Sequence, residues 1–149
     1  MRLLSLLGMM SVALATNANA ASHDPSFDAS LRRLEALIEQ GMSAREFTAE
    51  MYTPDTVVKT HGPTPPRKGL AAEEVSIAAF LDSLAPPGQR KCTFEPVDPV
   101  TRTAEVTAAF INFSCRGKDA TTAEPNQKYH ILYVWKKVGD DWKVALEMF

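Results

Sequence analysis

The sequence predicts an α+β domain in which about three N-terminal helices pack on a curved antiparallel sheet. Up to about residue 84, apolar residues recur at helical spacing. From Arg90 onward the pattern has a period of two and is rich in β-branched and aromatic residues. Helices followed by strands are typical of a domain whose helices cover one face of an antiparallel sheet.

Residues 1–20 have the three parts of a cleavable secretory signal peptide. Arg2 gives the positive start, residues 3–15 form an apolar segment too short to span a bilayer, and Ala18–Ala20 offers a small-x-small cleavage site. The alternative is a membrane anchor that stays attached. We therefore expect a periplasmic or secreted protein without a stable membrane anchor, and one domain over residues 21–149.

Three helices are expected before residue 90. Leucines and an isoleucine recur at helical spacing over residues 31–38, and Gly41 is a natural stop after them. Residues 43–46 fit a capping box for a second helix, which ends near Pro54 because the residue before a proline avoids the helical region. The third helix is expected from about Leu70 to Leu84.

One short strand and four longer ones are expected. The short strand covers residues 56–61 and leads into a proline-rich loop, residues 62–69, which we expect to be stiff and to form no internal ladder. The polar segment 116–126 is a loop, and the Gly139-Asp140 pair is a tight hairpin turn. The longer strands are expected at Cys92–Val97, Thr103–Cys115, Gln127–Val138 and Asp141–Phe149.

Counting in twos from this turn predicts the two faces of the last hairpin. The face expected under the helices carries Tyr129, Ile131, Tyr133, Trp135, Trp142, Val144, Leu146 and Met148. The opposite face carries His130, Leu132, Val134, Lys136, Lys143, Ala145, Glu147 and Phe149. This second face has an apolar centre, so we expect it to meet a second copy of the chain in a homodimer. His130 and Glu147 are expected to approach each other there as a surface contact.

Cys92 and Cys115 are an even pair in a chain that we expect to reach an oxidising compartment. Their segments resemble neighbouring strands joined by a turn near residues 101–103, which would place the two cysteines opposite each other. A disulfide is the first interpretation, and two free buried thiols are the alternative. Their spacing, without a CxxC motif, argues against zinc or redox chemistry.

The charge pattern and the histidines exclude several classes of partner. Without Arg2 the chain is mildly acidic and has no basic stripe, so we expect no nucleic-acid partner. His61 and His130 project to different faces, so we expect no metal site, and we expect no cofactor.

Three short segments carry a resemblance to a known family: Met51–Val58, Gly69 at the start of a helix, and Trp135–Val144. They resemble the nuclear transport factor 2-like superfamily, in particular an exported bacterial member of its SnoaL-like and ketosteroid-isomerase-like branches. The resemblance covers essentially all of residues 21–149 in the order of elements. It implies a cone of helices over a strongly bent sheet, an apolar cavity between them, and dimerisation through the sheet. This fold hosts many activities, so the motifs indicate the fold more than the function.

The ketosteroid-isomerase-like branch implies three catalytic positions, which this sequence fills differently. The carboxylate base falls at Thr60, whose hydroxyl cannot take a carbon-bound proton at neutral pH. The first oxyanion-binding tyrosine falls near Glu35 or Ala36. The second oxyanion donor matches Tyr133, which keeps a hydroxyl. Isomerisation of the steroid type is therefore disfavoured.

Four residues remain as candidates for ligand binding. The resemblance places Tyr52 in the cavity, the hairpin count points Tyr133 and Trp135 inward, and His61 is expected near the cavity mouth. Tyrosine hydroxyls in an apolar cavity could orient a ligand that carries an oxygen. The alternatives are that both tyrosines and Trp135 are core residues and that His61 is simply exposed.

We therefore expect an exported domain that binds a small, mainly apolar molecule between its helices and its sheet, with catalytic residues unknown. One alternative is a lyase- or isomerase-type enzyme that uses Tyr52, Tyr133 and His61. Another is a protein–protein interaction module whose cavity is filled by side chains.

Overall fold

The computed structural model describes residues 24–149, and of residues 98 and 99 only the backbone. The predicted signal peptide lies outside the described residues. The helices are α1 (Pro25–Gln40), α2 (Ala44–Met51) and α3 (Leu70–Ser83). The strands are β1 (Tyr52–Lys59), β2 (Arg67–Lys68), β3 (Cys92–Arg102), β4 (Val106–Cys115), β5 (Gln127–Val138) and β6 (Asp141–Met148).

The six strands form one curved sheet in the order β2-β1-β6-β5-β4-β3. The prediction of an antiparallel sheet needs correction, because β1 runs parallel to β6 and the sheet is therefore mixed. Within the segment interpreted as a loop, Arg67 and Lys68 form the short strand β2 and pair with Val58 and Val57 of β1. The expected strands at residues 92–115 and 127–148 are confirmed within a few residues.

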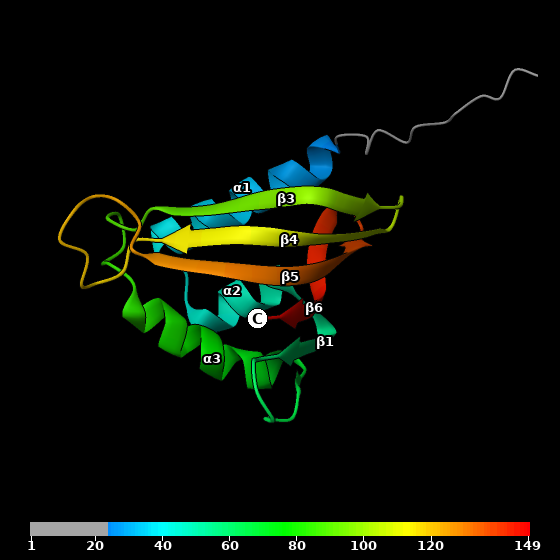
Figure 1. Ribbon diagram of the computed structural model, residues 1–149, viewed down its shortest axis with the longest axis horizontal. Coiled ribbons are helices and arrows are strands. Elements are labelled where there is room, and N and C mark those ends of the chain that lie inside the picture. The colour runs from blue at the N-terminus through cyan, green and yellow to red at the C-terminus, as the bar shows by residue number, and fades with distance from the viewer. Residues whose placement is uncertain (1–23) are drawn as a thin grey trace, which may run out of the picture.

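The predicted three helices lie on one face of the sheet. Figure 1 looks onto the other face, so that β3, β4 and β5 stand in front of α1 and α2, while α3 crosses below them. Ser43 and Glu46 form the predicted capping box, and Gly41 ends α1 in the left-handed conformation that glycine adopts most readily. No helix in the described range is long and apolar enough to cross a membrane.

Aromatic residues fix α1 against the sheet. The ring of Phe27 meets Trp135 and Trp142 edge-on, with centroids 5.6 and 5.7 Å apart. Both indoles are buried, and the Trp142 Nε1 donates a hydrogen bond to the Ser26 hydroxyl at 2.9 Å. Trp135 is therefore part of the core between α1 and the sheet.

The last hairpin contains a β-bulge. Trp135 pairs with Val144, whereas the preceding residue on β5, Val134, pairs with Leu146. Ala145 is thus an extra residue on β6 without an opposite partner. A bulge of this kind bends the strand and reverses the alternation of side chains beyond it.

The bulge corrects the predicted faces of β6. Trp142 is buried as expected. Beyond the bulge the count in twos is wrong: Glu147 is buried under the helices and Phe149 faces the same side, whereas Leu146 is only half-buried and Met148 is exposed. Because of the bulge, Glu147 and Phe149 lie on the covered face, where the count in twos had placed Leu146 and Met148.

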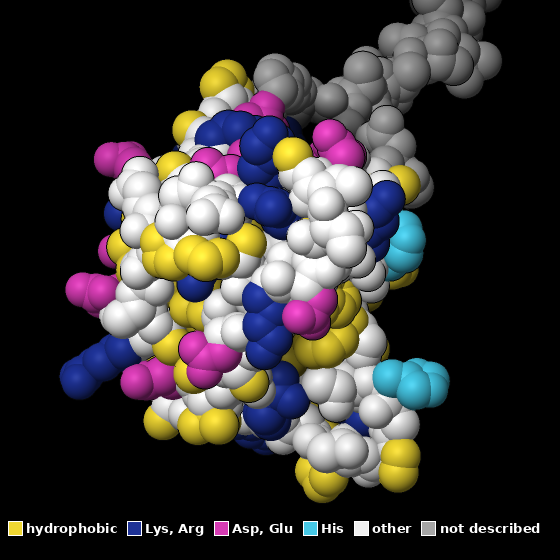
Figure 2. Space-filling model, turned by 90° about the vertical axis from the view of Figure 1, so that its left-hand side faces the viewer, with side chains coloured by type: hydrophobic (Ala, Val, Ile, Leu, Met, Phe, Trp, Pro, Cys, Tyr) yellow, Lys and Arg dark blue, Asp and Glu magenta, His cyan; other side chains and the backbone are white. Residues whose placement is uncertain are grey.

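The opposite, outer face of the sheet has an apolar row. Phe110 on β4 pairs with Val97 on β3 and with Leu132 on β5, and Phe110 is 56% exposed. The homodimer through this face stays a prediction. At the end of the molecule shown in Figure 2, acidic and basic side chains are mixed and neither charge dominates.

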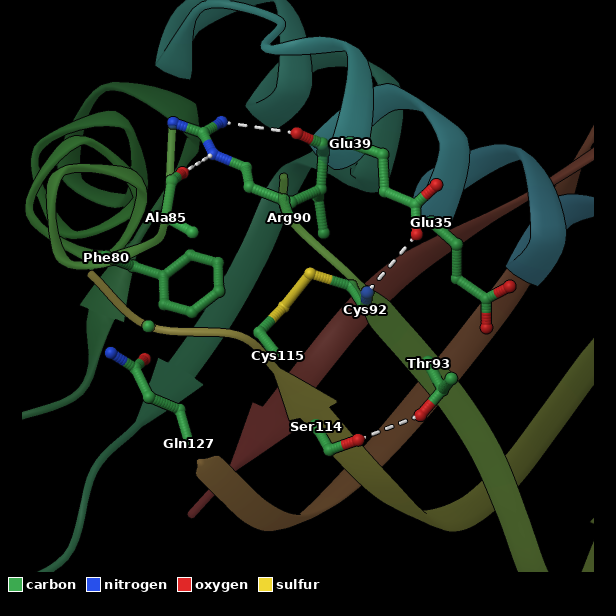
Figure 3. The surroundings of a disulfide bond; sticks show 12 residues. Glu35, Glu39, Phe80, Ala85, Arg90, Cys92, Thr93, Ser114, Cys115 and Gln127 are labelled. Carbon is green, nitrogen blue, oxygen red and sulfur yellow. Dashed lines mark hydrogen bonds between the residues drawn. A yellow bond between two sulfur atoms is a disulfide. The ribbon is translucent and has the colours of Figure 1, made fainter. Parts of the chain in front are cut away.

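The outer edge of the sheet is covered by charged side chains of α1. The Glu35 carboxylate accepts a hydrogen bond from the Phe94 backbone nitrogen at 2.7 Å, and Arg32 donates to the Phe94 carbonyl at 3.1 Å. Glu39 accepts from the Cys92 nitrogen at 3.3 Å (Figure 3). These contacts satisfy backbone groups of β3 that would otherwise be open to pairing with another strand.

The predicted disulfide joins the same edge to the neighbouring strand. Cys92 and Cys115 lie directly opposite each other on β3 and β4 and are bonded through their sulfurs. Both are buried next to the carboxylates of α1, as Figure 3 shows. The pairing inferred from the sequence is confirmed.

Replacing both cysteines, Cys92→Ala with Cys115→Ala, should lower the free energy of unfolding by about 3 kcal/mol, because the bond restricts a loop of the unfolded chain. Urea unfolding without reductant measures the difference. Dithiothreitol should weaken the wild type by a similar amount and leave the double variant unchanged. Equal midpoints for both proteins in the absence of reductant would contradict this role.

Candidate functional site

A cavity of about 350 Å³ lies between the helices and the inner face of the sheet. Its walls are mainly aliphatic and aromatic, and they come from all three helices and from most strands. The apolar side chains that dominate these walls are Phe47, Ile77, Phe80, Phe94, Phe113 and Ile131. The size and lining are typical of a site for a small molecule.

Five polar side chains line the cavity close to one another, and we call them the polar cluster. They are Tyr52 of β1, Arg67 of β2, Glu73 of α3, Tyr133 of β5 and Glu147 of β6. Five different elements therefore contribute one residue each. The cluster exists only when the sheet and α3 are assembled.

Glu147 is the centre of the polar cluster. The bulge in β6 turns its side chain inward, where it pairs in register with Tyr133 on the neighbouring strand. The Tyr52 hydroxyl donates a hydrogen bond to the Glu147 carboxylate. Glu147 is 5% exposed, and within the described part of the chain no lysine, arginine or histidine forms an ion pair with it.

Burial raises the pKa of Glu147 from 4.5 to about 7. Loss of hydration disfavours the charged form, and the nearby Glu73 carboxylate adds to this effect. The hydrogen bond from Tyr52 and the more distant Arg67 act in the opposite direction without cancelling it. Near neutral pH, Glu147 can therefore accept or release a proton inside an apolar cavity.

Glu73 lies in the same cavity but has a cationic partner. Arg67 donates from Nε and Nη2 to its two carboxylate oxygens at 2.7 and 3.2 Å. Glu73 is 1% exposed, so this bidentate pair compensates a deeply buried charge. The short strand β2 holds Arg67 in place through its pairing with β1.

The two tyrosines supply hydroxyl groups that remain protonated. Burial, followed by the charge of Glu147, raises the pKa of Tyr52 and of Tyr133 well above the ordinary value. Tyr52 already donates to Glu147. Tyr133 lines the cavity opposite Glu147, so its hydroxyl is placed to meet a bound molecule.

The structure brings together two of the four predicted ligand-binding residues. Tyr52 and Tyr133 line the cavity. Trp135 points inward as expected but lies in the core against Phe27, outside the cavity lining. His61 is exposed in the loop after β1 and is not among the residues that line the cavity.

The positions implied by the ketosteroid-isomerase-like branch do not form the site. Thr60 follows β1 and Glu35 binds the edge strand, and neither lines the cavity. His130 meets Asn112 on β4, with 2.6 Å between Nδ1 and Oδ1, and not Glu147 as expected. Among the described residues, no group of three or more His, Cys, Asp or Glu is arranged to hold a metal ion.

Sequence reasoning missed Glu147, Glu73 and Arg67. Glu73 stands beside Glu74 in a mostly apolar helix, so the sequence showed two carboxylates there but not which of them is buried. Arg67 lies in a segment interpreted as a loop. Glu147 carried no local signal, because its direction depends on a bulge that pairing with β5 creates.

Comparisons with known proteins identify the fold. No family model and no curated protein matches the sequence. A putative calcium/calmodulin-dependent protein kinase type II association domain from Thiobacillus denitrificans matches the structure with a TM-score of 0.58 and 16% identity, over 84% of this chain and 96% of that chain. A nuclear transport factor 2-like protein with a cystatin-like fold from Novosphingobium aromaticivorans matches with a TM-score of 0.54 and 15% identity, over 80% of this chain and 75% of that chain.

A putative ketosteroid isomerase from Parabacteroides distasonis also matches, with a TM-score of 0.51 and 15% identity, over 78% of this chain and 81% of that chain. Identities this low show the fold alone. The chain has the nuclear transport factor 2-like, cystatin-like fold that the sequence resemblance predicted.

The raised pKa makes the contribution of Glu147 to stability depend on pH. Between about 4.5 and 7 the folded chain keeps a proton that the unfolded chain has released, so this contribution is complete below 4.5 and is lost as the pH rises through 7. In Glu147→Gln the side chain does not titrate, so its contribution to stability does not change as the pH rises. Relative to wild type, its free energy of unfolding should rise by about 3 kcal/mol between pH 4.5 and 8.

Urea unfolding followed by tryptophan fluorescence at four pH values across this range measures the difference. Glu124→Gln makes the same chemical change on an exposed loop and serves as the control. Its difference from wild type should stay constant with pH. A constant difference for Glu147→Gln as well would show that the carboxyl group titrates normally.

Proposed function

We propose that the chain is an exported domain that binds a small, mainly apolar molecule carrying one polar group. The single observation that carries this proposal is the 350 Å³ cavity, whose apolar walls lead to a compact polar cluster. An apolar molecule would bind by burying its surface against the aromatic side chains. Its polar group would lie at Glu147 and Tyr133, where buried hydrogen-bonding groups favour a partner.

Export rests on two observations of different kinds. The sequence predicts a signal peptide over residues 1–20, and the domain carries the disulfide between Cys92 and Cys115. Disulfides persist in oxidising compartments such as the periplasm or the extracellular space. Both observations support a periplasmic or secreted location.

A second candidate function is an isomerase- or lyase-type reaction in the same cavity. Glu147, with a pKa of about 7, favours it because a group that titrates near the working pH can move a proton efficiently. Tyr133 would stabilise developing negative charge on an oxygen of the substrate. His61 takes no part, which changes the catalytic set expected from the sequence.

Filling the cavity should abolish binding. Ser76 on α3 lines the cavity, whereas the adjacent Val75 is 73% exposed. Ser76→Phe should weaken the binding of N-phenyl-1-naphthylamine, a neutral apolar probe, by tenfold or more, because the new ring occupies the space. The fluorescence of the bound probe measures its affinity.

Val75→Phe is the matched control and should bind like wild type. If the wild type does not bind the probe, or if Ser76→Phe binds it as tightly as wild type, the result favours a protein–protein interaction module over a ligand-binding domain.

The isomerase-type candidate predicts exchange of carbon-bound hydrogen. With 4-phenylbutan-2-one in heavy water, the wild type should accelerate deuterium uptake next to the carbonyl group. Glu147→Gln should lose this activity, and Tyr133→Phe should reduce it by tenfold or more while retaining binding. Nuclear magnetic resonance follows the exchange. Binding of the ketone without exchange in the wild type would leave the simple binding function.

A further inference from the structure

The charges that face the cavity do not balance. The lining contains one cationic side chain, Arg67, and two carboxylates, Glu73 and Glu147. Arg67 donates hydrogen bonds from Nε and Nη2 to the two carboxylate oxygens of Glu73. When Glu147 is ionised, the cavity therefore holds one negative charge without a cationic partner in the described part of the chain.

The charges and hydrogen bonds around Glu147 favour a cationic partner for its carboxylate. Tyr52 and Tyr133, on the strands to either side, are neutral hydroxyl groups. From α3, Glu73 adds negative potential, and from β2, Arg67 offsets only part of it. Within the described residues, one hydrogen bond, from Tyr52, reaches the carboxylate. Its remaining acceptor capacity fits a ligand that brings N–H donors and positive charge.

A wall of aromatic rings continues from this point along the cavity. Phe113 stands between Phe80 and Phe94, with ring centroids 5.6 and 4.5 Å away. Phe113 of β4 pairs with Tyr129 of β5, and Glu147 of β6 pairs with Tyr133 of β5. Tyr129 and Tyr133 are four residues apart on the same strand. At about 3.3 Å per residue, these two positions are about 13 Å apart along β5. An elongated molecule could reach both.

We propose that the cavity selects a hydrophobic amine, whose ammonium group pairs with the Glu147 carboxylate beside Tyr133 and whose apolar body lies along Phe80, Phe94 and Phe113. This inference rests on the proposed binding function and adds the chemical class of the ligand. The aromatic faces also accommodate positive charge during entry, which aliphatic walls would not.

The pH dependence separates an amine from a neutral ligand. The amine pairs with ionised Glu147, whereas a ketone or an alcohol needs no charge there. With a pKa of about 7, Glu147 is ionised to about 10% at pH 6 and about 90% at pH 8. The affinity for an amine that stays protonated should therefore rise about tenfold over this range. A ketone that accepts a hydrogen bond from protonated Glu147 should show the opposite trend.

The test uses three probes with the same phenylbutyl skeleton: 4-phenylbutylamine, 4-phenylbutan-1-ol and 4-phenylbutan-2-one. Each displaces N-phenyl-1-naphthylamine from wild type, Glu147→Gln and Glu124→Gln at pH 6 and pH 8. We expect wild type and Glu124→Gln to prefer the amine by tenfold or more at pH 8. Glu147→Gln should lose both this preference and its dependence on pH while still binding the alcohol.

Three outcomes would overturn the inference. If the alcohol or the ketone binds as tightly as the amine at pH 8, the cavity binds apolar molecules but does not select amines. If Glu147→Gln keeps the preference, Glu147 is not the partner of the ammonium group. If neither the naphthylamine nor any of the three probes binds to wild type, the proposed binding function falls together with this inference.

Discussion

The bulge at Ala145 is the constraint on which the cavity depends. Because two residues of β6 face one position of β5 at this point, the strand bends and the next carboxylate turns under the helices. If the same sequence continued from Val144 without a bulge, Leu146 would pair with Tyr133 and would occupy that place on the inner face. The inward turn brings Glu147 to Tyr52 and Tyr133, on the two strands beside β6. One local irregularity thus sets the chemistry of the whole inner face.

The two buried carboxylates in the cavity have different partners, and this difference gives them different chemical roles. Glu73 is compensated by a bidentate arginine, so its charge is part of the structure. Among the described residues, Glu147 has a hydrogen bond from a tyrosine hydroxyl and no ion pair, and burial raises its pKa to about 7. A fold that served stability alone would gain by placing an apolar residue there, since an uncompensated buried carboxylate is costly. Its presence is the main reason to look for a ligand or a proton-transfer role.

The edge of the sheet formed by β3 is held by several contacts. The side chains of Arg32 and Glu35 bind both backbone groups of Phe94, and the disulfide ties β3 to β4 close by. Phe94 also forms part of the aromatic wall of the cavity. Contacts that protect the edge strand from pairing with another chain therefore also fix one wall of the binding site.

The sequence by itself determined the classes of the elements, most of their limits, the disulfide and the fold family, because periodicity, caps and turn residues are local signals. The apolar repeat over residues 31–38 marked only the second half of α1, although Asp24 and Pro25 carry the cap and first-turn signals of its start. The tertiary structure alone decided the parallel pairing of β1 with β6, the bulge, and hence the polar cluster. These depend on which strands meet and in what register. Such contacts join residues far apart in the chain and leave no pattern within either segment.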